Sequence, residues 1–316
     1  MPAASEWTFH GEAITEAISG AASPVDAIAP DLAARVYHLY LPIYFFTREA
    51  AARHRKQEPG SAICIGLSAP QGCGKTTLVD LLTARFAADG FACAAVSIDD
   101  FYLTGAEQDA VASGHAANPL LQVRGNAGTH DLPLGAQTLR NLQSRVSDAE
   151  ALKLPRYDKA QRDGRGDRAP ASAWPQLPEP ADVVVLEGWM AGFAPVEPGH
   201  PALAKHCGLE EINAKLAAYE SAWHALMDAW VVLGMEDPKV VYTWRLQAEH
   251  AMKEAGRPGM TDAQVADFVT RYMPAYEAYL PGLYAAAEGS GVGGSPTFLA
   301  WVDEGRNAAQ VQAAPR

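Results

Sequence analysis

The chain has 316 residues, of which 48% are hydrophobic and 20% charged, and this composition is typical of a globular protein with a sizeable core. Its formal net charge of −12 argues against a wide nucleic-acid or anionic-membrane surface, because neutralising phosphates requires an excess of clustered Lys and Arg. No run approaches the roughly 18 consecutive apolar residues of a membrane span. We therefore predict neither nucleic acid nor a membrane as a partner.

Two features bear on the cellular compartment. The cysteines show neither a CxxC pair nor a spacing that makes a zinc site with nearby His, so we expect reduced thiols. Glu6, Glu12 and Glu16 stand where a signal peptide would be cationic and then apolar. These observations predict a cytoplasmic protein. The cysteines are Cys64, Cys73, Cys93 and Cys207.

Residues 1–60 are rich in alanine and show helical periodicity in places. Val36, Leu39, Tyr40 and Ile43 fall at helical spacing, and the segment ends in a polar run at 53–60. We predict an N-terminal helical extension over 1–60, followed by the main domain over 61–316.

A strand, a Gly-rich loop, a helix and a second strand follow in quick succession. The apolar run at 62–67 indicates a buried strand, and residues 76–89 have a helical apolar face that ends at Gly90. A second strand is predicted at 92–98. A unit of this kind implies a right-handed crossover and therefore a parallel sheet.

Further apolar runs indicate buried strands, and the segments between them have helical periodicity. The architecture expected from this alternation is a doubly wound α/β domain without internal repeats. Tyr219, Trp223 and Met227 are four residues apart and are interpreted as core rather than as a base-stacking platform. The strands are predicted at 183–186, 230–233 and 298–302, and helices at 134–146, 211–227 and 263–272.

The strongest motif is the segment 69–76, Ala-Pro-Gln-Gly-Cys-Gly-Lys-Thr. It matches the phosphate-binding loop (P-loop) pattern, with Ala69 in place of the first glycine. In such a loop backbone N–H groups wrap a phosphate, Lys75 reaches the β- and γ-phosphates, and the Thr76 hydroxyl holds Mg²⁺. The alternative is a Gly-rich turn with a chance match. The expected nucleotide-binding residues are Gln71, Gly72, Cys73, Gly74, Lys75, Thr76 and Thr77.

Acidic residues follow two of the predicted strands. Asp99 and Asp100 end the second strand, where they can serve as general base and metal partner, or merely as a turn carboxylate or helix cap. Adjacent residues leaving a strand point to opposite sides, so only one of the two can face an acceptor hydroxyl. Glu187 ends the run at 183–186 and is placed as a residue near Mg²⁺ should be, although a strand that ends in an acid is common.

Basic residues gather between these acids. The Pro- and Gly-bearing segment 153–168 is predicted to be a loop whose Arg156 and Arg168 could clamp a carboxylate or phosphate, whereas Arg162 and Arg165 fit a solvated surface. The polar stretch 118–131 fits a substrate-recognition loop. Residues 236–262 could form a helical lid in which Arg245 stabilises transferring charge, or a helix with exposed arginines.

Together these segments resemble the plant-type D-glycerate 3-kinases, which belong with uridine kinase, phosphoribulokinase and pantothenate kinase in a wider group of P-loop kinases. The resemblance runs in order from about residue 61 to 307. The segments that carry it lie at 66–77, 97–103, 124–131, 155–159, 164–168, 187–190, 244–249 and 303–307.

The resemblance implies ATP- and Mg²⁺-dependent phosphorylation of the 3-hydroxyl of D-glycerate. It assigns Asp99 as general base, Glu187 to the metal and Arg245 to the phosphates. Plant members carry a chloroplast transit peptide that we do not recognise here, which favours a bacterial enzyme. A kinase for another hydroxylated metabolite, such as uridine or pantothenate, and a non-catalytic ATP-responsive protein remain alternatives. The candidate metal ligands are Thr76, Glu187 and Asp100, and the candidate substrate residues are Arg124, Asn126, His130, Asp131, Arg156, Tyr157 and Arg168.

Overall fold

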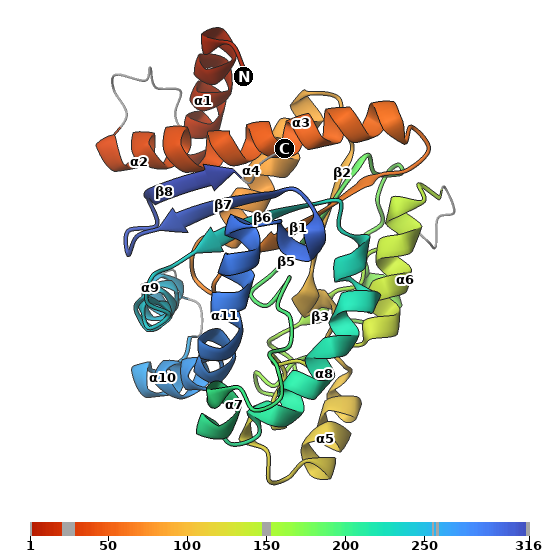
Figure 1. Ribbon diagram of the computed structural model, residues 1–316, viewed down its shortest axis with the longest axis vertical. Coiled ribbons are helices and arrows are strands. Elements are labelled where there is room, and N and C mark those ends of the chain that lie inside the picture. Colours follow the sequence, from red (N-terminus) through yellow and green to blue (C-terminus); the bar gives the residue numbers. More distant parts are fainter. Residues whose placement is uncertain (1, 21–28, 147–152, 255, 257–258, 314–316) are drawn as a thin grey trace.

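The computed structural model describes residues 2–20, 29–146, 153–254, 256 and 259–313. Its centre is a six-stranded sheet with the strand order β2-β5-β1-β6-β7-β8 (Figure 1). The first five strands of this order run parallel, and β8 pairs antiparallel with β7. The strands are β1 Ile63–Ser68, β2 Cys93–Ser97, β5 Val183–Gly188, β6 Ala229–Gly234, β7 Thr297–Val302 and β8 Ala308–Ala313.

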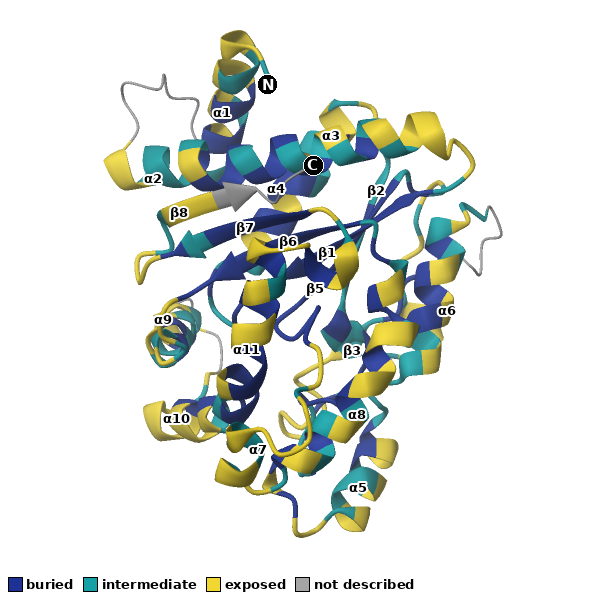
Figure 2. Ribbon diagram, in the orientation of Figure 1, coloured by how far each residue is buried: buried dark blue, intermediate teal, exposed yellow. Residues whose placement is uncertain are grey.

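Helices cover both faces of the sheet, which explains why its strands read as nearly continuous apolar runs. Strands β1 and β6 are buried along their whole length, as their dark blue colour in Figure 2 shows. Helices α3 (Leu41–Gln57) and α4 (Lys75–Ala88) pack on one face, and α6 (Leu132–Gln143) and α11 (Met273–Glu288) pack on the other. The predicted doubly wound α/β architecture is confirmed.

The N-terminal segment is helical, as predicted. It contains α1 (Ala4–Ser19), α2 (Pro30–Arg35) and a π-helical turn, Val36–Tyr40, that leads into α3. The four apolar side chains singled out by their helical spacing are buried and belong to the same hydrophobic core as the sheet. A domain boundary at residue 60 therefore remains a proposal.

The other elements lie mostly beyond the carboxyl edge of the sheet (Figure 1). Tyr219, Trp223 and Met227 are buried, which confirms their interpretation as core. Residues 153–168, expected to be a loop, contain the short antiparallel hairpin β3 (Tyr157–Asp158) and β4 (Asp167–Arg168). Within the described residues no helix is both long and apolar enough to cross a bilayer. The remaining helices are α5 Gly105–Gly114, α7 Pro201–Lys205, α8 Leu209–Ala222, α9 Val240–Glu254 and α10 Asp262–Thr270.

Candidate active site

The P-loop connects the carboxyl end of β1 to the first turn of α4. Gly72 and Gly74 have φ values of 80° and 96°, a left-handed conformation that residues with a Cβ rarely adopt. The loop is tied to the neighbouring strand, because the Ala69 amide donates a hydrogen bond to the Gly188 carbonyl at 3.1 Å. The predicted strand-loop-helix setting is thus present, and the helix N-terminus supplies unpaired amides for an anion.

Lys75 is the first residue of α4, and its side chain folds back over the loop. Its Nζ donates to the Pro70 carbonyl at 3.0 Å. Thr76 and Thr77 follow in the first turn and are exposed. The ammonium, the first-turn hydroxyls and the loop amides are therefore close together, as phosphate binding requires.

Three residues that we did not predict as site residues pack behind the P-loop. The Tyr276 hydroxyl accepts a hydrogen bond from the Gln71 amide at 3.1 Å, and Arg306 Nε donates to the Gly72 carbonyl at 2.7 Å. A Cβ built on Gly72 would lie 2.7 Å from the Cβ of Trp244. The loop therefore lies directly against α9, α11 and the turn between β7 and β8.

Asp99 and Asp100 follow β2 in a 3₁₀ turn, Ile98–Phe101, and not in extended backbone. Strand alternation therefore does not determine where they point, which corrects the reason we gave for separating them. The Asp99 carboxylate accepts hydrogen bonds from the Tyr102 hydroxyl at 2.8 Å and from Lys159 Nζ at 2.5 Å.

Asp100 contacts a different set of groups. Its carboxylate accepts hydrogen bonds from Arg156 Nη1 at 3.2 Å and from the backbone amides of Ser97 and Tyr157 at 3.2 and 3.4 Å. It thus caps its own turn and holds the hairpin that carries Tyr157. None of these contacts tests whether Asp100 binds the metal, so that role stays a prediction.

The two carboxyl groups also differ in acidity. Burial alone would raise the pKa of Asp99, but the Lys159 ammonium and the hydrogen bonds from Lys159 and Tyr102 outweigh burial and lower this pKa to about 2. Burial raises the pKa of Asp100 despite the opposing charge of Arg156. Asp99 is consequently a carboxylate throughout the neutral pH range.

Glu187 lies between the two motifs. In the sheet it pairs with Leu67 of β1 on one side and with Ser97 of β2 on the other. Its Oε2 is buried and has no hydrogen-bond partner among the described residues. Burial raises the pKa of Glu187, and the charge of Lys75 opposes this.

The residues present fit a magnesium ion. Mg²⁺ is held in many nucleotide sites by one or two protein oxygens, phosphate oxygens and several waters. The orphaned oxygen of Glu187 and the hydroxyl of Thr76 are ligands of this kind. Within the described ranges, no group of three or more His, Cys, Asp and Glu side chains could form an all-protein metal site.

Several of the predicted substrate residues meet around Tyr102. The His130 ring stacks on the Tyr102 ring with centroids 4.6 Å apart, and its Nδ1 lies 2.7 Å from the Tyr219 hydroxyl. Burial lowers the pKa of His130 to about 4, so the ring is neutral. Arg168 Nη2 donates to Asp131 and to the Tyr102 carbonyl, each at 2.9 Å.

This cluster contains buried polar atoms without a protein partner among the described residues. His130 Nε2, Tyr157 Oη and Arg168 Nε are buried, and none has a partner in the described part of the chain. The Tyr157 ring meets the Tyr102 ring edge-on at 5.2 Å. Buried polar groups are nearly always hydrogen-bonded, so these three atoms indicate a polar ligand.

Other predicted substrate residues bind the protein itself. Arg124 donates to the carbonyls of Gly164 and Arg165, and Asn126 Nδ2 donates to the Leu120 carbonyl at 3.1 Å. Their direct contact with substrate remains a prediction. Arg162 and Arg165 both pair with Asp109 of α5, in agreement with their interpretation as surface residues.

Arg245, predicted to meet the phosphates, forms an ion pair with Glu249 one turn later on α9. Glu249 is buried, and its Oε2 accepts a hydrogen bond from the Met260 amide at 2.8 Å. The preceding Trp244 is fully buried against the P-loop. The lid over 236–262 stays a proposal, and residues 255, 257 and 258 of it lie outside the described residues.

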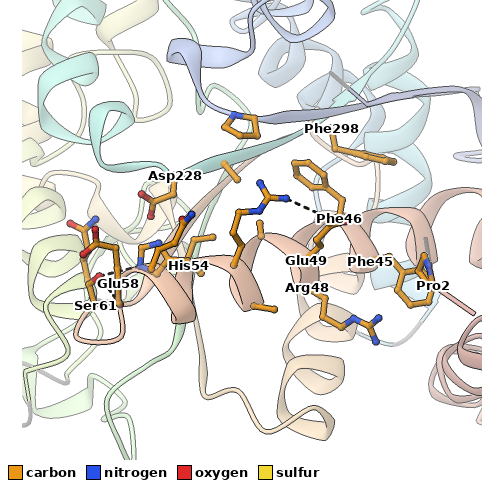
Figure 3. A pocket seen from close by; sticks show the side chains of 18 of the residues that line it. Pro2, Phe45, Phe46, Arg48, Glu49, His54, Glu58, Ser61, Asp228 and Phe298 are labelled. Carbon is orange, nitrogen blue, oxygen red and sulfur yellow. Dashed lines mark hydrogen bonds and ion pairs between the residues drawn. The ribbon is translucent and has the colours of Figure 1, made fainter. Parts of the chain in front are cut away.

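A cavity of about 1040 Å³ opens at the opposite edge of the sheet, at the amino ends of β1, β6 and β7 (Figure 3). The Phe46 and Phe298 rings line it with centroids 5.5 Å apart. His54 Nε2 and the Ser61 hydroxyl form a hydrogen bond at 3.1 Å, and Asp228 accepts a hydrogen bond from a backbone amide of β1 at 2.8 Å. Because the motif residues lie at the other edge, this cavity is not the candidate active site.

Comparisons with known proteins agree with this geometry. The sequence model of the "Phosphoribulokinase / Uridine kinase family" matches residues 64–197. The "D-glycerate 3-kinase, chloroplastic" of Arabidopsis thaliana is 45% identical over 278 residues, which cover 87% of this chain and 60% of the relative. A "probable ATP-dependent kinase" of Saccharomyces cerevisiae is 35% identical over 256 residues, which cover 77% of this chain and 85% of the relative.

A solved structure is similar over nearly its whole length. The D-glycerate 3-kinase of Cryptococcus neoformans superimposes with a TM-score of 0.75 at 33% identity, covering 87% of this chain and 99% of the other. The chain spans about 60% of the length of the chloroplastic relative.

Proposed function

Because this chain belongs to the D-glycerate 3-kinase family of P-loop kinases, we propose that it transfers the γ-phosphate of ATP to the 3-hydroxyl of D-glycerate, giving 3-phosphoglycerate and ADP. The observation that carries the proposal is the placement of Asp99. This carboxylate lies at the same edge of the sheet as the P-loop and Glu187, and the His130 ring stacked on its partner Tyr102 carries a buried nitrogen without a protein partner among the described residues.

The proposed mechanism relies on positioning and electrostatics. The loop amides and Lys75 bind the β- and γ-phosphates. Thr76 and Glu187 would hold Mg²⁺, which neutralises phosphate charge when bound. Asp99 accepts the proton of the substrate hydroxyl as the phosphoryl group arrives, because each of its oxygens keeps a lone pair beyond the bonds to Tyr102 and Lys159.

D-Glycerate is an anion, so its recognition requires a local excess of positive charge in a chain whose net charge is −12. Lys159 donates to the Asp99 carboxylate, and Arg168 donates to the backbone carbonyl of Tyr102. Arg168 Nε has no partner among the described residues, and the donor pattern of a guanidinium suits a carboxylate. We propose Arg168 as the substrate-carboxylate ligand, with Tyr157 and neutral His130 contacting the hydroxyl groups.

An acceptor panel tests the proposal. Purified protein with ATP and Mg²⁺ should release ADP rapidly with D-glycerate and at background rate with uridine or pantothenate. Rapid turnover of either alternative acceptor would reassign the substrate. If none of the three acceptors causes ADP release above background, the non-catalytic ATP-responsive protein is favoured.

A metal prediction follows from the donor set of Glu187 and Thr76. We expect EDTA to abolish transfer and excess Mg²⁺ or Mn²⁺ to restore it, since these oxygens would hold a hard divalent cation that neutralises phosphate charge. The measurement is the initial rate of ADP release before and after metal is restored. Undiminished transfer in EDTA would contradict the assignment.

A further inference from the structure

A contact between distant parts of the chain lies behind the P-loop. Arg306 occupies the turn between β7 and β8, and its Nε donates to the Gly72 carbonyl at 2.7 Å. Its guanidinium lies 5.3 Å from the centroid of the Trp244 ring. Arg306 has a φ of 65°, a left-handed conformation that is uncommon for a residue with a side chain. The turn thus directs a charged donor at a loop carbonyl.

The bond to Gly72 affects the next amide. A trans peptide is planar, so its C=O and N–H point in opposite directions, and the described residues contain no cis peptide. Holding the Gly72 carbonyl towards Arg306 therefore turns the Cys73 N–H away from it. This N–H donates a long hydrogen bond to the Pro70 carbonyl, with 3.4 Å between N and O, and the same carbonyl accepts from Lys75 Nζ at 3.0 Å. The Cys73 amide is therefore on the Lys75 side of the loop.

The surroundings leave Arg306 little freedom. Trp244 packs against Gly72, and its indole Nε1 donates to the Glu304 carbonyl at 2.8 Å. Asp303 closes the turn by accepting from the Asn307 amide at 2.8 Å. The turn and α9 therefore form one rigid backing for the P-loop.

The N-terminal helices reach the same turn. Arg35, at the end of α2, donates from Nη2 to the Gly305 carbonyl at 2.8 Å and lies 3.5 Å from Asn307 Oδ1. The N-terminal helical segment is therefore connected to the P-loop through residues 305–307. This connection gives α2 a link to the candidate active site.

We propose that Arg306 is a positioning residue for phosphoryl transfer: it holds the Gly72–Cys73 peptide so that the Cys73 amide faces the phosphates of the nucleotide, and Arg35 holds the turn that carries it. The inference rests on the proposed function for its effect on turnover, but its effect on nucleotide binding does not depend on the acceptor. Arg306 touches the loop and not the substrate, so its role differs from that of Lys75.

The test uses the full chain and two substitutions at one position. Arg306→Met keeps most of the side-chain length but removes the donor, and Arg306→Lys keeps a cationic donor. We expect Arg306→Met to raise the Kd for Mg·ADP and the KM for ATP about tenfold, the size expected for losing a charge-assisted hydrogen bond, and to leave the KM for D-glycerate unchanged. Arg306→Lys should recover most of the loss.

Two further variants complete the test. Arg35→Ala should raise the Kd for Mg·ADP about threefold, because the turn loses one support while Arg306 stays; it also serves if Arg306→Met does not fold. Arg53→Ala, at an exposed position of α3 and at the opposite edge of the sheet, should bind Mg·ADP as the wild type does. Calorimetric titration with Mg·ADP measures each Kd.

The outcomes separate the two claims. Wild-type affinity for Mg·ADP in Arg306→Met, or an equal rise in the KM for D-glycerate, would overturn the positioning role. If Arg306→Met does not fold, wild-type affinity for Mg·ADP in Arg35→Ala would also overturn the positioning role. A wild-type protein that binds Mg·ADP but does not phosphorylate D-glycerate would refute the acceptor assignment alone, and the binding comparison would still decide the role of Arg306.

Discussion

We expect Lys75→Ala to lower kcat by roughly 10²–10³-fold, because the proposed role of Lys75 is to bring the cation of the P-loop to the transferring phosphate. The side chain is half-buried over its own loop and contacts a carbonyl, not the hydrophobic core. The substitution should therefore leave the fold intact. Steady-state turnover with saturating ATP and D-glycerate measures the effect.

Lys56→Ala is the matched control. Lys56 is an exposed lysine near the end of α3, which leads into the amino end of β1 and so lies across the sheet from the P-loop, and its loss should change neither turnover nor thermal unfolding. If Lys75→Ala keeps wild-type turnover with an unchanged unfolding temperature, the P-loop does not bind the transferred phosphate and the kinase mechanism is wrong.

The second large effect concerns the base. Asp99→Asn should lower kcat by roughly 10²–10⁴-fold, the range typical of removing a general base, with a smaller effect on the KM for ATP. The amide keeps the size of the side chain but cannot take the hydroxyl proton. The measurement is kcat at saturating ATP and D-glycerate, with thermal unfolding recorded alongside.

Asp100→Asn is the internal comparison, since it makes the same change one residue later. Asp100 binds Arg156 and two backbone amides, so its replacement should weaken the turn and the β3–β4 hairpin while lowering kcat less than Asp99→Asn does. If Asp100→Asn loses most of its kcat while Asp99→Asn keeps a nearly normal kcat, the two roles must be exchanged. Normal turnover in both would mean that no carboxylate of this pair assists proton removal.

Features set by local sequence could be predicted. The strands of the parallel sheet are apolar runs because both faces are covered, and the P-loop is recognisable because its glycines, lysine and threonine act within eight consecutive residues. Gly90 ends α4 with a φ of 75°, as its position suggested. We made no prediction for α11, which has Pro281 in its interior, a position that proline rarely occupies in a helix.

Features that depend on distant contacts could not be predicted. Lys159 is one of several cations in its segment, and only the folded hairpin brings its ammonium to Asp99. Arg156 and Arg124 looked alike in the sequence, yet one binds a carboxylate and the other backbone carbonyls. Arg306 lies in one of the segments that carry the family resemblance, but its contact with the P-loop could not be predicted, because its partner Gly72 lies 234 residues away.

The position of the new phosphate tests the central claim most directly. After reaction of the protein with Mg·ATP and D-glycerate, proton-coupled phosphorus NMR of the product distinguishes a phosphate on the primary 3-hydroxyl, split by two protons, from one on the secondary 2-hydroxyl, split by one. We predict the 3-phosphate signal alone, in an amount equal to the ADP formed. A 2-phosphate product, or ADP formation with inorganic phosphate in place of phosphoglycerate, would contradict the proposal.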